Sequence, residues 1–159
     1  MRMSSSSARA VSILLLIIAA SMYSRMLTLS TIPQQATMMF AEAGLGLMGF
    51  MLIYLVRVII MGMILDSTSI MLILLPLALP IVAELGGNLI WFGIVTVIAV
   101  EIGLLTPPFG LTIYVVKSTI SDRSTTLGDI FVGTFPFALM MTLATLVLTF
   151  VPALSLVFE

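Results

Sequence analysis

The chain has 159 residues, of which 61% are hydrophobic and only 8% are charged, with a formal net charge of −1. Soluble domains carry about 25% charged residues, so this composition indicates an integral membrane protein. The sequence contains no cysteine and no histidine. That excludes disulfides, thiol nucleophiles, imidazole bases and the usual zinc or copper sites, and no basic surface points to nucleic acid. Any bound metal should be a hard ion held by oxygen.

Residues 1–44 are predicted to form a transmembrane helix followed by a short helix at the membrane surface. Residues 11–27 are almost wholly apolar and lack a clear small-residue cleavage site, which favours a retained helix over a cleaved secretory peptide. Arg25, at the polar end of this helix, is expected to reach the interface. In residues 30–44, Thr31 can cap a helix and Pro33 suits its first turn. A plain polar loop is the alternative for this stretch.

Residues 45–83 are predicted to form a helical hairpin. Residues 45–65 are apolar except for Arg57, polar residues follow at 66–69, and residues 70–83 are apolar again. A second arm over 70–83 would extend about 21 Å, less than the ~30 Å hydrocarbon core, which suggests a re-entrant hairpin with its tip at 62–69. Two full crossings remain an alternative because the first arm is long enough to span. Arg57 could pair with a carboxylate, reach the surface or attract an anionic substrate.

Asp66, at the predicted hairpin tip, admits two interpretations. Its carboxylate could bind a cation or orient a ligand at membrane depth. It could also cap the second arm, because aspartate is among the preferred residues at a helix N-terminus. The two roles are compatible.

Residues 84–117 are predicted to form one discontinuous transmembrane helix. The sequence ELGGN (residues 84–88) is a turn in which Asn88 can cap the next helix, and Trp91 is expected at the membrane interface. The helix over residues 89–105 is interrupted within EIGLLTPPFGLT (residues 101–112) and continues briefly over 113–116.

The interruption combines two adjacent prolines with glycines, threonines and a carboxylate. Pro107 and Pro108 lack N–H groups, so carbonyls one turn earlier lose their helical partners, and Gly103 and Gly110 let the backbone leave helical geometry. Non-helical backbone at membrane depth is tolerated only where it is buried in protein or lines a cavity, so we expect a site for a cation or polar substrate. A proline kink without a ligand is the alternative.

The remaining segments are an aqueous loop over residues 118–129 and a C-terminal region over 130–159. The loop is expected to be a solvated connection. Residues 130–151 are predicted to form the last spanning helix, with Pro136 near its start and Pro152 after its end.

The stretch EIGLLTPPFGLT resembles the large membrane subunit of tripartite ATP-independent periplasmic (TRAP) transporters, of the dicarboxylate permease type. The resemblance extends upstream to GMILDSTSIMLILLPLALPIV (residues 62–82) and GNLIWFGIV (residues 87–95), and downstream through FPFALM and FVPALSL. It covers nearly all of this chain but only the C-terminal part of that subunit. It implies an all-α integral membrane fold, half of an inverted-repeat elevator-type transporter, in the bacterial inner membrane.

The resemblance also implies a function and a set of partners. The family couples sodium to the uptake of C4-dicarboxylates or similar organic acids, with no cofactor other than the coupling ion. The expected partners are a small membrane subunit, a periplasmic substrate-binding protein and the remaining N-terminal part of the permease. The residues expected to bind ion or substrate are Gly62, Asp66, Ser67, Thr68, Glu101, Thr106, Pro107, Gly110 and Thr112, with Thr106, Gly110 and Asp66 as the sodium ligands.

Two departures from the family pattern bear on selectivity. Thr112 stands where asparagine is frequent, and Glu101 stands where many members differ. The sequence shows no ATP-binding loop, phosphate cradle or catalytic triad, so an enzyme is not expected. The alternatives to a transporter are a structural or assembly membrane protein without transport activity alone, and a small ion channel using Asp66 and Glu101.

Overall fold

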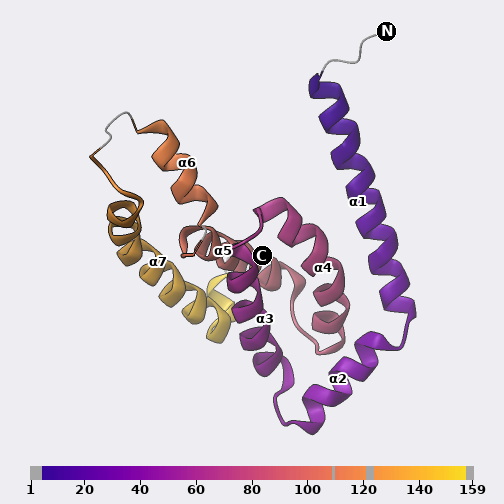
Figure 1. The fold of residues 1–159 in the computed structure, drawn as a ribbon. Helices are drawn as coiled ribbons and strands as arrows, with labels where there is room; N and C mark the ends of the chain where they lie inside the picture. The colour runs from indigo at the N-terminus through magenta and orange to yellow at the C-terminus, as the bar shows by residue number, and fades with distance from the viewer. Residues whose placement is uncertain (1–4, 109, 121–123, 157–159) are drawn as a thin grey trace.

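The computed structural model describes residues 5–108, 110–120 and 124–156, and within these ranges every regular element is a helix. This confirms the predicted all-α fold. The chain runs through α1 (Ser5–Leu29), α2 (Ile32–Glu42), α3 (Gly46–Gly62), α4 (Ser67–Glu84), α5 (Leu89–Leu105), α6 (Leu111–Thr119), α7 (Leu127–Phe150) and the short 3₁₀ helix η1 (Pro152–Leu154). Figure 1 shows α1 on one side of the molecule and α6 with α7 on the other, around α3, α4 and α5.

The helix α2 confirms the predicted short helix after the first apolar run. Pro33 lies in its first turn, where a missing N–H costs no helical hydrogen bond. Thr31 occupies the capping position, but its side chain makes no capping hydrogen bond; instead the hydroxyl of Ser30 accepts one from the Ile32 N–H at 3.3 Å. α2 is attached to the end of α4, because the Gln34 amide donates to Glu84 at 2.6 Å.

The second arm of the hairpin is longer than expected. It begins at Ser67 rather than at residue 70, and its 18 residues correspond to about 27 Å. Pro76 and Pro80 lie inside this helix without ending it. The prediction of a short arm was therefore wrong, and arm length no longer favours a re-entrant hairpin over two crossings.

Two helices within the described residues are individually long and apolar enough to cross a membrane, α4 and α7. A third span is counted only if Leu14–Leu27 and Ile32–Glu42 are taken together as one bent pair. α3 and α5 are shorter apolar helices. The chain is thus a membrane protein, as its composition indicates.

α5 is the centre of the packing. It contacts α3, α4, α6 and α7, and Phe92, Val95 and Ala99 are completely buried along it. The predicted cap is confirmed, since the Asn88 side chain accepts hydrogen bonds from the N–H groups of Ile90 at 2.8 Å and Trp91 at 3.2 Å.

Trp91 is buried between helices rather than exposed on the surface, and its position at the membrane interface stays a prediction. Its side chain is only 1% exposed, and its indole Nε1 donates to the Leu148 carbonyl at 2.7 Å. In a regular helix that carbonyl would receive the N–H of residue 152, but Pro152 has none. The tryptophan therefore satisfies a backbone acceptor that the end of α7 leaves open.

Candidate functional site

The hairpin turn is formed by the end of α3, residues 63–66, and the start of α4. Asp66 caps α4: its carboxylate accepts the Ser69 N–H at 3.1 Å and the Ser69 hydroxyl at 2.5 Å. The predicted capping role is confirmed. The Asp66 side chain is otherwise exposed, so carboxylate lone pairs remain for a further ligand.

The turn lies directly beside the end of α5, because Gly62 and Gly103 contact each other through their backbones. A Cβ placed on Gly62 would lie 2.8 Å from the Cα of Gly103, and one placed on Gly103 would lie 2.6 Å from the Cα of Gly62. Gly103 was expected to help the backbone leave helical geometry. It lies instead inside α5, and its role is to let α3 approach.

The interruption between α5 and α6 occurs where the sequence places it. α5 ends at Leu105 and Thr106 is extended, with φ −97° and ψ 137°. Pro107 and Pro108, joined by a cis peptide bond, cannot donate to the carbonyls of Gly103 and Leu104. The Gly103 carbonyl receives the Thr106 N–H at 3.0 Å instead.

The Thr106 hydroxyl is also used in this turn. It donates to the Ile102 carbonyl at 2.5 Å, which replaces the main-chain hydrogen bond lost there. Its oxygen lone pairs remain available as acceptors, so it could still contribute to a cation site.

Gly110 starts the second part of the broken helix. It is buried, has φ +46°, and its carbonyl accepts the Ile113 N–H at 2.7 Å. A Cβ at this position would lie 3.0 Å from a ring carbon of Phe131 in α7. α6 then runs over nine residues, longer than the predicted 113–116, with Thr112 half-buried in its first turn.

An apolar cavity of about 590 Å³ adjoins the interruption on the side of α7. Thr106 and Pro107 line it together with Ile59 of α3. Other lining residues come from α7, among them Phe131, Phe135 and Thr142. The cavity places the broken segment next to open space, although its walls are mostly hydrocarbon.

The structure does not gather all the candidate residues. Ser67 and Thr68 line a different cavity, between α1 and α4. Glu101 is exposed on α5, two residues before Gly103 and so on nearly the opposite side of the helix from the contact with α3. Within the part of the chain that the structure describes, no three acidic residues come together as a metal site. A cation here would depend on carbonyl and hydroxyl oxygens.

The model of the family "Tripartite ATP-independent periplasmic transporter, DctM component" matches residues 1–154. The chain belongs to this family.

Curated relatives of this TRAP chain are named as transporter permeases, which are not enzymes. The C4-dicarboxylate large permease protein DctM of Pseudomonas aeruginosa is 33% identical over 146 residues, covering 92% of this chain and 34% of the relative. DctM of Rhodobacter capsulatus is 34% identical over 152 residues, covering 95% of this chain and 34% of the relative. The isethionate permease protein DctMQ of Oleidesulfovibrio alaskensis is 27% identical over 150 residues, covering 92% of this chain and 22% of the relative.

The TRAP chain spans about a third of the length of these DctM relatives, each of which it covers to 34%. No solved structure matches it. The names of the relatives differ in substrate, so family membership alone leaves the substrate open.

Proposed function

We propose that this chain forms the C-terminal part of a secondary active TRAP transporter that moves C4-dicarboxylates or similar organic acids across the bacterial inner membrane, coupled to sodium. The contact between Gly62 and Gly103 carries the proposal, because it brings the hairpin turn next to the interrupted helix. Discontinuous helices in secondary transporters bind ions and substrates at such places. The names of the two DctM relatives support a C4-dicarboxylate as substrate.

In this proposal the sodium ion is held by Asp66, Thr106 and Gly110, with backbone carbonyls completing its shell. Pro107 and Pro108 remove the helical donors of the Gly103 and Leu104 carbonyls; the Thr106 N–H replaces the first, and a dehydrated cation would take the place of the second. The positive N-terminal ends of α4 and α6 would attract the substrate carboxylates. Gly62 and Thr112 are further proposed members of this site. Ser67, Thr68 and Glu101 stay proposed as ion- or substrate-binding residues of the complete permease, although within this chain they lie on other surfaces.

The proposed partners are the remaining N-terminal part of the permease, a small membrane subunit and a periplasmic binding protein that delivers the substrate. The chain supplies one hairpin and one broken helix, α3–α4 and α5–α6. Inverted-repeat transporters place their site between two such halves.

The test is sodium-dependent uptake of a labelled C4-dicarboxylate by the complete permease with its partners in vesicles. Thr106→Val removes the hydroxyl at nearly constant volume and should lower uptake at limiting sodium at least about tenfold, whereas Thr106→Ser should retain it. Thr145→Val is the matched control, since its buried hydroxyl makes the same kind of bond, to the Met141 carbonyl, on α7.

The three variants should be compared at equal amounts in the membrane. Uptake unchanged in Thr106→Val, or lowered equally in Thr145→Val, would contradict the assignment of Thr106. A continuous sodium current without substrate would instead support a channel.

A further inference from the structure

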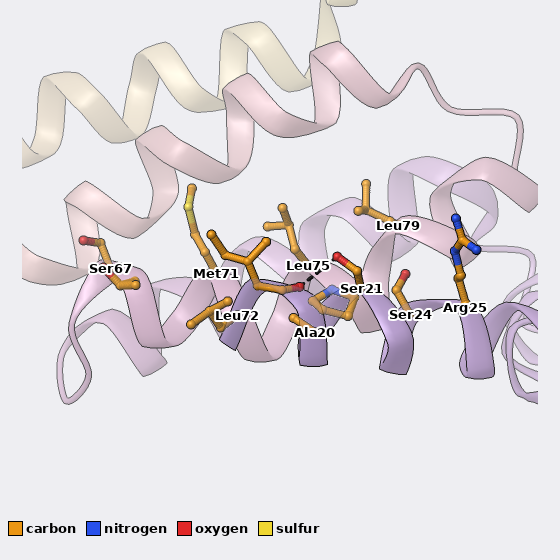
Figure 2. Close-up of a pocket in the computed structure, with 12 residues that line it drawn as sticks. Ala20, Ser21, Ser24, Arg25, Ser67, Met71, Leu72, Leu75 and Leu79 are labelled. Atoms are coloured by element: carbon orange, nitrogen blue, oxygen red, sulfur yellow. Dashed lines mark hydrogen bonds between the residues drawn. The ribbon is translucent and has the colours of Figure 1, made fainter. Parts of the chain in front are cut away.

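A groove runs between α1 and α4, on the other side of the hairpin from the contact with α5. It has a volume of about 570 Å³. Figure 2 shows Ser67 near one end and Arg25 near the other, with Met71, Leu72 and Leu75 along α4 between them. The groove is thus lined by apolar side chains of α4 in its middle, with serine and threonine hydroxyls on α1 and at the start of α4, and it is charged at one end.

The apolar middle of the groove fits a hydrocarbon chain better than an organic acid. Ser21, on the α1 side, donates its hydroxyl to the Ile17 carbonyl at 2.8 Å and so needs no external partner. A carboxylate placed here would lose its hydration without gaining a charged partner, which is strongly unfavourable. Arg25 lies only at the end of the groove.

The length of the groove matches one leaflet. From Ser67 to Leu79 the α4 backbone rises about 18 Å, close to half of the ~30 Å hydrocarbon core. This step depends on the proposed function, in which the hairpin turn lies at membrane depth. Arg25 and the end of α4 then fall near the headgroup layer.

Two opposite charges flank this end of the groove. Arg25 is exposed and makes no ion pair with any residue that the structure describes. A second cavity, of about 390 Å³, shares Ser24 and Leu79 with the groove and extends to Glu84. The Glu84 carboxylate accepts hydrogen bonds from the Gln34 amide at 2.6 Å and from the Thr37 hydroxyl at 3.5 Å, and the remaining lone pairs on its two oxygens keep further acceptor positions.

We propose that the groove between α1 and α4 binds one phosphatidylethanolamine molecule. One acyl chain lies along Met71, Leu72 and Leu75, the phosphate contacts Arg25, and the ammonium group contacts Glu84. A headgroup with both charges complements both side chains, whereas an anionic headgroup such as phosphatidylglycerol would leave Glu84 without a cation. The bound lipid would fill the space between α1 and the hairpin.

The test is the lipid retained by the purified chain after exchange into equimolar phosphatidylethanolamine and phosphatidylglycerol, extracted and quantified by mass spectrometry. Arg25→Gln should lower total retained phospholipid about fivefold, which is the effect of one basic side chain on binding to an anionic lipid surface. Glu84→Gln should lower retained phosphatidylethanolamine to the level of phosphatidylglycerol and so abolish the preference. Leu75→Trp, which fills the groove, should lower both lipids.

Arg57→Gln and Glu42→Gln are the matched controls. Arg57 lines a different cavity, between α2, α3 and α4, and Glu42 is exposed at the end of α2. Each should retain both lipids like the parent chain. Circular dichroism and gel filtration of all variants would establish that each is folded.

Equal retention by the parent chain, Arg25→Gln and Leu75→Trp would overturn the proposal, as would a headgroup preference that survives Glu84→Gln. Loss of the lipid on coexpression with the remaining part of the permease would show that protein covers the groove, and would also overturn it. Lipid retention is measured without transport, so the two proposals can fail separately. The lipid proposal can fail while sodium-dependent uptake is normal, and uptake can fail while the lipid is retained as expected.

Discussion

Gly62 and Gly103 form a backbone contact that leaves no room for a side chain on either residue, with built Cβ distances of 2.8 and 2.6 Å to the opposite Cα. The contact joins the end of α3 to the last turns of α5. The hairpin turn and the interrupted helix therefore depend on each other for position, and substitutions at this contact and at the nearby caps can test the arrangement.

Alanine at Gly103 should destabilise the chain, because its Cβ would also lie 2.7 Å from the Ile59 carbonyl oxygen. Backbone atoms cannot move aside cheaply, and overpacking of this kind costs about 1–3 kcal/mol. Thermal unfolding of the purified chain should show a lower midpoint. Gly93→Ala is the control in the same helix, since a Cβ there meets nothing within 4 Å; its midpoint should be equal or higher. A midpoint for Gly103→Ala matching that control would show that the two helices are not this close.

Gly110→Ala should also be destabilising, for two separable reasons. The backbone has φ +46°, a left-handed conformation that costs an alanine about 1–2 kcal/mol, and the new Cβ would press on Phe131. Adding Phe131→Leu should recover only the steric part, so the double variant should unfold between Gly110→Ala and the parent chain. Full recovery in the double variant would mean that backbone conformation contributes nothing.

Asp66 can be tested for its two roles by comparing two substitutions. Asp66→Asn keeps a side-chain oxygen for the Ser69 N–H but removes the charge, so this variant should preserve stability, whereas Asp66→Ala should lose about 1 kcal/mol. If Asp66 also binds sodium, Asp66→Asn should lower the apparent affinity for sodium in the uptake assay of the complete permease. If the Asp66→Asn variant is stable and its uptake depends on sodium as in the parent chain, capping α4 is the only role of Asp66.

The sequence predicted helix boundaries best where polar residues punctuate apolar runs. Both ends of α5 were predicted correctly, from Asn88 at its start and from the adjacent prolines at 107 and 108 after its end. A capping side chain and a missing N–H donor both act on neighbouring residues, so the sequence alone reveals them. The start of α4 was predicted too late, at residue 70. Asp66 is the N-cap residue of this helix, so the polar residues that follow it already belong to the helix.

What the sequence could not show is which helix faces which. Nothing local distinguishes a glycine that bends a helix from one that admits a neighbour, so Gly103 was assigned the wrong role. Ser67 and Thr68 were grouped with the interrupted helix from their position in the turn. Their contact with the groove beside α1 depends on how α4 packs. The burial of Trp91 likewise depends on α7, more than 50 residues later in the chain.

The bond from Trp91 to α7 gives the last prediction. Trp91→Phe removes the indole donor and leaves the half-buried Leu148 carbonyl without this partner, which costs about 0.5–1.5 kcal/mol. Pro152→Ala restores a main-chain N–H that could reach the same carbonyl, since a helix continued by one turn pairs residue 152 with residue 148. In a double-mutant cycle measured by thermal unfolding, Pro152→Ala should therefore offset part of the loss caused by Trp91→Phe. Strictly additive effects would indicate that the unsatisfied carbonyl is not the cause, and that Trp91 stabilises α5 and α7 through packing area alone.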